Sequence, residues 1–132
     1  MKSPDKFGEI IVRSVPERCH LREQGAFVSD LVQYMSEYRP RIVLDCSKLQ
    51  TMEGAVIYLI LCCLEEALKR NGDVRLAGVC PAALVVLEST GADRLFQIYP
   101  SSADAVESFH PRAALAYAAG TEIEIQVAES AA

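Results

Sequence analysis

Tryptophan is absent from this 132-residue sequence, and no cluster of lysine or arginine occurs in it. Acidic residues outnumber basic ones by 18 to 13, so the formal net charge is −5 at pH 7. Nucleic-acid binding rests largely on the neutralisation of phosphates by Lys and Arg. The composition therefore argues against nucleic acid as a partner.

A long apolar run is also missing. The longest nearly uncharged stretch, residues 54–64, is shorter than the ~20 residues that cross a bilayer. The N-terminus, MKSPDKFGEI, lacks the apolar region of a secretory signal. We therefore expect a cytoplasmic protein without direct membrane insertion. An apolar fraction of 51% argues against disorder, and the length suits a single domain over residues 1–132.

The five cysteines show no CxxC or Cys/His spacing typical of a metal site, and their odd number does not indicate a disulfide framework. We expect most of them to be small core side chains. We also expect no metal and no other cofactor. The cysteines are Cys19, Cys46, Cys62, Cys63 and Cys80.

Motifs typical of enzymes are missing too. The sequence contains no G-x-S-x-G elbow, no G-x-x-x-x-G-K-[ST] loop and no G-x-G-x-x-G turn. Cys46 ends a predicted strand, where a nucleophile could stand, but a buried inert thiol is the favoured interpretation. Asp45 is interpreted as an acceptor of hydrogen bonds from the turn rather than as a catalytic group. We expect no enzymatic activity.

Residues 41–72, RIVLDCSKLQTMEGAVIYLILCCLEEALKRNG, are the most informative part of the chain. They read as a buried strand, a short polar turn and a long apolar helix, which is half of a βαβ unit. The continuous apolar run of residues 41–46 is typical of a strand covered on both faces, so we expect it at the centre of the sheet. Function in such sheets is usually placed at the carboxyl end of a strand, beside the N-terminus of the next helix. Residues 51–54 hold that position here.

Turn signals divide the rest of the chain into alternating strands and helices. We expect strands at residues 8–15, 41–46, 73–79 and 95–99, with a short one in the ambiguous stretch 18–21. We expect helices at residues 25–39, 54–70, 81–90 and from 101 onward. The signals are Pro40 and Asn71-Gly72 as stops, Pro81 in a first turn, Gly91 as a left-handed cap, and Ser101 with Asp104 as a capping box.

The helix expected at residues 54–70 has a wide apolar stripe, so much of it must be buried. Its polar face is expected to carry the i, i+4 pairs Glu65–Lys69 and Glu66–Arg70. The stripe is expected to consist of Ile57, Ile60, Leu61, Leu64 and Leu68, flanked by Val56, Leu59, Cys63 and Ala67.

The C-terminal part differs from the rest. Residues 113–120 suggest a further helical turn or two after Pro111. In TEIEIQV, residues 121–127, apolar and polar residues alternate strictly, which argues a half-exposed strand at an edge or in a dimer interface. Homodimerisation through this strand is therefore a second expectation.

Three sequence elements together resemble the STAS domain, the fold of anti-sigma-factor antagonists and of the cytosolic tails of sulfate transporters. They are VLDCS before the turn, NGDVRLAGVCP around the following strand, and LESTGADRLFQIY after it. The resemblance covers residues 7–109 and leaves residues 110–132 as an extension. It implies an α/β fold with a mixed β-sheet of four to five strands and about four helices, plus a C-terminal helix and strand. It also implies docking against a protein partner, in the regulation of transcription, rather than turnover of a substrate.

In the regulatory branch of this family, a loop reading Asp-Ser-Ser/Ala-Gly begins the second helix, and a partner kinase phosphorylates its first serine to break the complex. Counting forward from Asp45 without gaps places Glu53 at the aspartate and Gly54 at the phosphorylated serine. Ala55 and Val56 then take the last two positions. A slip of two residues would instead place Met52 at the acceptor. Neither alignment provides a hydroxyl, so we expect a constitutive binder.

We therefore expect a partner-binding loop made of Ser47, Thr51, Glu53, Gly54 and Ala55, together with Tyr58 on the helix. The resemblance implies an anti-sigma factor or a serine kinase as the partner. Ser47 and Thr51 are alternative phosphate acceptors, although such residues more often satisfy backbone groups of turns. Glu53 has the alternative role of a carboxylate that meets the helix dipole. The alternative function is a small-ligand or lipid-transport accessory module, which binds an anionic group or a transporter subunit at the same helix N-terminus.

Overall fold

The computed structural model describes residues 10–17, 21–35 and 38–109. Strands and helices alternate along these residues, as predicted. The strands are β1 (Ile10–Ser14), β2 (Arg41–Asp45), β3 (Asp73–Ala77) and β4 (Gln97–Tyr99). The helices are α1 (Leu21–Tyr34), α2 (Gly54–Leu68), α3 (Pro81–Thr90), the short 3₁₀ helix η1 (Ala92–Leu95) and α4 (Ser102–Ser108).

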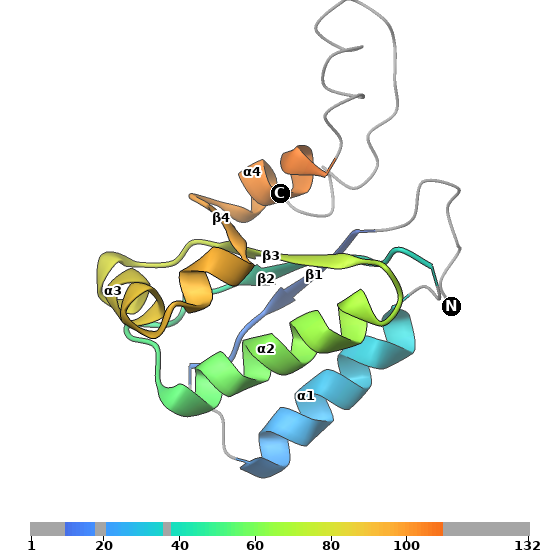
Figure 1. The fold of residues 1–132 in the computed structure, drawn as a ribbon, viewed down its shortest axis with the longest axis horizontal. Coiled ribbons are helices and arrows are strands. Elements are labelled where there is room, and N and C mark those ends of the chain that lie inside the picture. Colours follow the sequence, from blue (N-terminus) through green and yellow to red (C-terminus); the bar gives the residue numbers. More distant parts are fainter. Residues whose placement is uncertain (1–9, 18–20, 36–37, 110–132) are drawn as a thin grey trace, which may run out of the picture.

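The four strands form one sheet in the order β1-β2-β3-β4, and each neighbouring pair is parallel. Connections between parallel strands are almost always right-handed. Because the strand order advances in one direction, α1 and α2 lie side by side on one face of the sheet (Figure 1). The chain after β4 turns back, and α4 lies on the opposite face over β2, β3 and β4.

The predicted α/β class, the strand number and the helix number are confirmed. The pairings within the described residues are all parallel, so the antiparallel strand of a mixed sheet is not among them. Of the short strand expected at residues 18–21, Leu21 begins α1 instead, and residues 18–20 lie outside the described residues. The expected helix and strand of residues 110–132 also lie outside them.

Strand β2 is the centre of the fold, as its apolar run predicted. Its residues Ile42, Val43 and Leu44 are fully buried. Ile42 and Leu44 face the main core, which α1, α2 and α3 cover, whereas Val43 faces a smaller core with Ala105 and Val106 of α4. A strand with helices on both faces needs apolar side chains on both, which explains the continuous run.

Helix α1 begins and ends earlier than predicted. It begins at Leu21 and includes Gly25 in its second turn. A tertiary contact stabilises this first turn, because Gln24 is only 5% exposed and its Nε2 donates to the carbonyl of Ala55 at 3.0 Å. The helix ends at Tyr34. Arg39 has a left-handed backbone conformation with φ of 55°, and Pro40 precedes β2 rather than ending the helix itself.

The buried face of α2 is rotated from the prediction. The four residues expected only to flank the apolar stripe are buried, namely Val56, Leu59, Cys63 and Ala67. Leu68, which was expected in the stripe, is 56% exposed. Ile57 and Leu61 are only partly buried. The buried side chains are Val56, Leu59, Ile60, Cys63, Leu64 and Ala67.

The ion pairs of α2 also differ in part. The pair Glu66–Arg70 forms as predicted, at 3.1 Å. Lys69, however, lies 3.2 Å from Glu66 rather than pairing with Glu65. Both cations therefore share one carboxylate, and they lower the pKa of Glu66 through hydrogen bonds with Arg70 and Lys69.

Most of the predicted caps are confirmed. Pro81 begins α3, Gly91 closes it with φ of 82°, and the Ser101 hydroxyl accepts the backbone N–H of Asp104 at 3.2 Å. The strand predicted at residues 95–99 is shorter, because Leu95 belongs to η1 and β4 contains only Gln97–Tyr99.

Candidate functional site

The candidate site is the loop between β2 and α2, at the carboxyl end of the central strand. Its first turn is closed by Asp45, whose Oδ1 accepts the backbone N–H of Ser47 at 3.0 Å. The carbonyl of Cys46 accepts the N–H of Leu49 at 3.0 Å. The predicted role of Asp45 as a hydrogen-bond acceptor of the turn is confirmed.

Two apolar side chains anchor the loop from within. Leu49 and Met52 are each 2% exposed and belong to the main core. Cys80, which precedes α3, donates its Sγ proton to the carbonyls of Leu49 and Gln50, both at 3.4 Å. The sequence analysis missed these anchors, although two apolar residues within a polar turn were a signal for them.

The polar side chains of the loop face outward. Glu53 takes the N-cap position of α2, and its carboxylate makes no capping hydrogen bond. Gly54 is the first helical residue, and a Cβ added to it would meet no atom within 4 Å. Ala55 is half-buried, and its carbonyl accepts the side chain of Gln24 from α1. The exposed residues are Ser47, Lys48, Gln50, Thr51, Glu53 and Gly54.

Tyr58 lies one turn further along α2, and 59% of it is exposed. It borders a groove of about 630 Å³ between α1 and α2, together with Gln24, Val28, Cys62 and Glu65. A side-chain hydrogen bond with Cys62 raises the pKa of Tyr58. The structure therefore places Tyr58 on the same end of the molecule as the loop, but within a groove that α1 helps to form.

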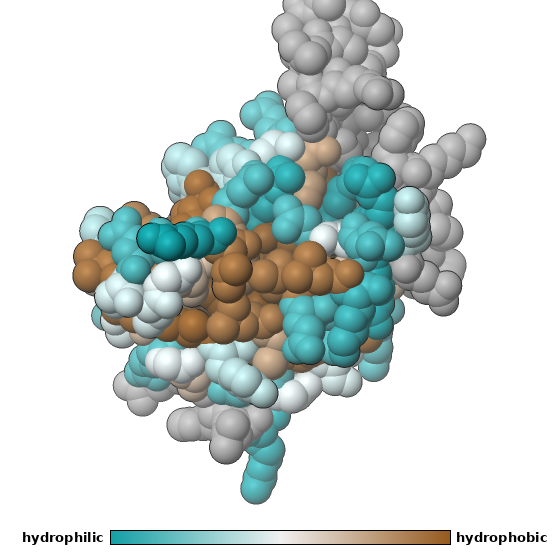
Figure 2. Space-filling view, viewed as in Figure 1, coloured by the Kyte–Doolittle hydropathy of each residue, from teal (hydrophilic) through white to brown (hydrophobic). Residues whose placement is uncertain are grey.

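The opposite flank of α2 is apolar. Figure 2 shows a continuous hydrophobic area between α2 and the strands above it, with α3 beside it. Leu68 of α2, Val85 of α3 and Leu95 of η1 are each more than half exposed. Exposed apolar areas of this kind often mark interaction surfaces.

Catalytic chemistry has little support at this site. The thiol of Cys46 is fully buried and donates to the carbonyl of Leu44 at 3.7 Å. Burial, with Asp45 nearby, raises the pKa of Cys46 to about 12, so the thiol stays protonated near neutral pH. The predicted inert role of Cys46 is confirmed. Within residues 10–17, 21–35 and 38–109, no group of three His, Cys, Asp or Glu residues could hold a metal ion.

Cys46 is expected to make the protein less stable at alkaline pH. The unfolded chain releases the thiol proton near pH 9.0, whereas the folded protein keeps it until about 12. Stability that is fully present below pH 9 is therefore lost as the pH rises, by up to about 1.4 kcal/mol per pH unit. Denaturant unfolding of wild type and Cys46→Ala at several pH values measures this loss. Parallel slopes for the two proteins above pH 9 would contradict the prediction.

The bond between Gln24 and the loop end is expected to contribute measurably to stability. Gln24→Met keeps the size of the side chain but removes its hydrogen bond to the Ala55 carbonyl, which should cost about 1 kcal/mol. Gln33→Met is the matched control, because Gln33 is exposed on the same helix. Equal urea midpoints for the two variants would show that the bond contributes nothing.

The sequence profile of the STAS domain matches residues 17–105. These residues make up more than half of the chain, so the chain belongs to the STAS domain family, as the resemblance implied. No curated protein matches the sequence significantly. Within the described residues, no helix has both the length and the apolar character needed to cross a membrane.

Several solved structures are similar to this fold. An anti-sigma-factor antagonist (STAS) domain protein from Planctomyces limnophilus has 21% identity and a TM-score of 0.61, over 73% of this chain and 86% of that one. A chain from the stressosome has 19% identity and a TM-score of 0.68, over 80% and 93%. The STAS domain of a SulP transporter from Vibrio cholerae has 15% identity and a TM-score of 0.57, over 70% and 73%. At these identities, the similarity shows the shared fold.

Proposed function

We propose that this protein is a non-enzymatic docking module that binds a regulatory protein partner through the loop at the N-terminus of α2. The observation that carries the proposal is the loop's construction. Leu49 and Met52 hold it from within, while Thr51, Glu53 and Gly54 face solvent on a fixed backbone. A preorganised loop loses little conformational freedom when a partner covers it. A cytoplasmic partner such as an anti-sigma factor or a serine kinase fits this role.

The partner is bound without the serine switch of the regulatory branch. A residue that a kinase modifies must be accessible, and Met52 is 2% exposed whereas Gly54 is exposed. This difference favours the gapless count, which assigns the acceptor position to Gly54. Phosphorylation would add about −1.5 to −2 charges at the start of α2, and glycine cannot carry it. Thr51 and Ser47 are the Ser and Thr residues nearest to that position in sequence.

Site-specific photo-crosslinking in the native cell tests the proposal. A photoreactive amino acid replaces Thr51 or Tyr58, and mass spectrometry identifies the captured protein and any phosphate on the bait. Ala103, which is exposed at the start of α4 on the opposite face of the sheet, is the control position. We expect the same partner from positions 51 and 58 and none from position 103.

Two outcomes would overturn parts of this proposal. Capture from position 103 alone would move the interface to the α4 face. Stoichiometric phosphate on Ser47 or Thr51 would replace constitutive binding with a switch. Homodimerisation through residues 121–127 lies outside the described residues and stays a prediction, which a monomeric mass at micromolar concentration would contradict.

A further inference from the structure

The face of the sheet that carries α4 is apolar at one end and charged at the other. Helix α4 has seven residues and covers Val43 and Ala77 with Ala105 and Val106. Towards the amino ends of β2 and β3, the same face carries Arg41, Asp73 and Arg75. In the strand register, Arg41 stands directly opposite Asp73. This charged end is remote from the candidate docking loop, which lies at the carboxyl ends of the strands.

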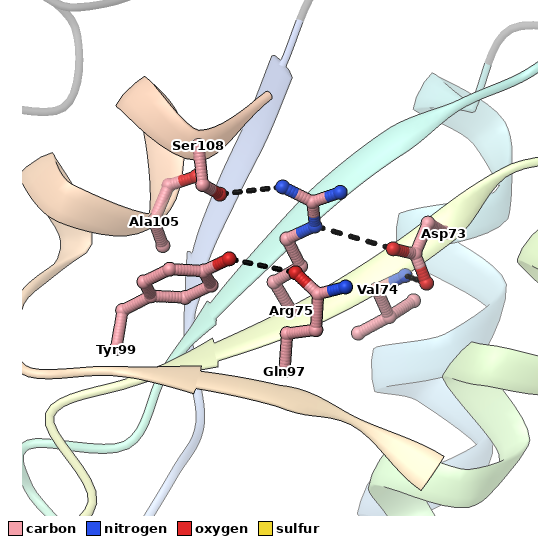
Figure 3. Close-up of polar contacts among 7 residues, drawn as sticks. All are labelled: Asp73, Val74, Arg75, Gln97, Tyr99, Ala105 and Ser108. Carbon is pink, nitrogen blue, oxygen red and sulfur yellow. Dashed lines mark hydrogen bonds and ion pairs between the residues drawn. The ribbon is translucent and has the colours of Figure 1, made fainter. Parts of the chain in front are cut away.

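Arg75 forms an ion pair with the carboxylate of Asp73. Its Nε lies 3.2 Å from Oδ2 of Asp73, and its Nη1 donates to Oγ of Ser108 at 2.5 Å (Figure 3). The other oxygen of Asp73, Oδ1, accepts the N–H of Val74 at 2.9 Å. The guanidinium of Arg75 also lies over the ring of Phe109, 3.9 Å from its centroid. Both oxygens of Asp73 are thus engaged, although Arg41 stands opposite it.

Arg41 is left among charges of its own sign. It is half-buried, and burial, Arg39 and Arg75 all lower the pKa of its guanidinium. None of the ion pairs between described residues includes Arg41 or Arg39. Of these three guanidinium groups, only that of Arg75 is paired with the carboxylate of Asp73, in a protein whose net charge is −5. Arginine forks suit bidentate pairing with carboxylates, so this arrangement fits an anionic ligand.

The chain itself offers such a ligand near the cluster. Phe109, stacked on Arg75, is the last described residue, so everything that follows it is tethered there. Residues 121–127, TEIEIQV, place Glu122 and Glu124 on one side of an alternating pattern. The eleven residues between Phe109 and Thr121 can span up to about 40 Å when extended. A short tether gives a high effective concentration for an intramolecular contact.

We propose that Arg41 and Arg39 form a binding site for carboxylates, and that its ligand is the acidic stretch 121–127 of the same chain, through Glu122 and Glu124. The contact neutralises the excess positive charge of this face. It also covers the end of the sheet that α4 leaves open. The proposal does not depend on the docking loop, because the two sites use opposite ends of the strands.

Hydrogen exchange of the full-length protein, followed by mass spectrometry, tests this contact. We expect amides of residues 121–127 to exchange about tenfold more slowly in wild type than in Arg41→Gln or in Glu122→Gln/Glu124→Gln, as for a pair of charge-assisted bonds. Combining both changes should add no further loss, because they remove the same contact. Arg22→Gln, an exposed arginine on α1, is the matched control and should leave exchange unchanged.

The glutamate variant keeps the test decisive if Arg41→Gln alters the fold, since it leaves every described residue unchanged. Equal exchange of residues 121–127 in wild type and in the glutamate variant would overturn the proposal. Protection that rises with protein concentration, together with a dimeric mass, would overturn the same-chain ligand and favour instead the homodimer that the alternating pattern of residues 121–127 predicts. Protection that is independent of concentration and lost at about 1 M salt is the expected result.

Discussion

The substitution Gly54→Arg is expected to abolish binding of the partner while leaving the fold intact. A Cβ added at Gly54 meets no atom within 4 Å, and Gly54 is exposed in the first turn of α2, so a longer side chain can extend into solvent. The positive charge at the helix N-terminus costs about 0.3–1 kcal/mol, which the better helix propensity of arginine partly offsets. A bulky charge in the centre of an interface should cost at least about 2 kcal/mol, or roughly thirtyfold in affinity.

The matched control is Ala103→Arg, which adds the same charge to the first turn of another helix, on the opposite face of the sheet. Affinity capture from the native cell and thermal unfolding are measured for both variants. We expect Gly54→Arg to lose the partner, Ala103→Arg to keep it, and both to unfold near the wild-type temperature. Retention of the partner by folded Gly54→Arg would place the interface elsewhere, with the apolar flank of α2 as the next candidate.

Gly72→Ala is expected to destabilise the protein strongly. An added Cβ would lie 2.6 Å from Cγ and Cδ of Pro40 and closer still to its carbonyl oxygen. That oxygen also accepts the N–H of Asp73 at 2.9 Å, so neither chain segment can move without breaking the start of the sheet. Overpacking of this kind costs about 2–3 kcal/mol, which lowers Tm by roughly 10 °C in a domain of this size.

The same substitution at Gly25 should have the opposite effect. Gly25 lies within α1, and its added Cβ would have open space around it. Replacing a glycine inside a helix with alanine stabilises by about 0.5–1 kcal/mol. Calorimetry of both variants therefore separates the close contact at Gly72 from a general effect of alanine. A Tm of Gly72→Ala equal to that of wild type would show that Pro40 does not press against this glycine.

Local signals in the sequence predicted the ends of helices, because these depend on residues within about one helical turn. Pro81 and Gly91 act within α3 itself, and Ser101 caps α4 through an amide three residues away. The central position of β2 was predictable as well, because an apolar run requires cover on both faces. These features need no knowledge of what lies across the fold.

Features that depend on distant residues could not be predicted. The early start of α1 is coupled to Gln24, whose partner Ala55 is 31 residues away. The buried face of α2 was misplaced because apolar side chains occur around most of the helix, and only packing decides which of them are covered. Leu68, in the last turn, remains exposed although its type suggested burial.

The candidate site likewise contains some residues that could be predicted from the sequence and others that could not. The outward residues Thr51, Glu53 and Gly54 could be located from the strand–turn–helix pattern. The anchors could not, since Cys80 reaches the loop from a segment about thirty residues further along the chain, at 3.4 Å from the Leu49 carbonyl. The excess of arginine around Arg41 could not be predicted either, because Arg75 lies on the neighbouring strand and comes near Arg41 only through the register of β2 and β3.

The brevity of β4 has a consequence for self-assembly. An all-parallel sheet that continues through many molecules requires the first edge strand of one copy to pair with the last edge strand of the next. The last strand, Gln97–Tyr99, offers three residues and is followed by Pro100, which has no N–H to donate. Within residues 10–17, 21–35 and 38–109, head-to-tail polymerisation of the sheet therefore lacks a full-length template at the β4 edge.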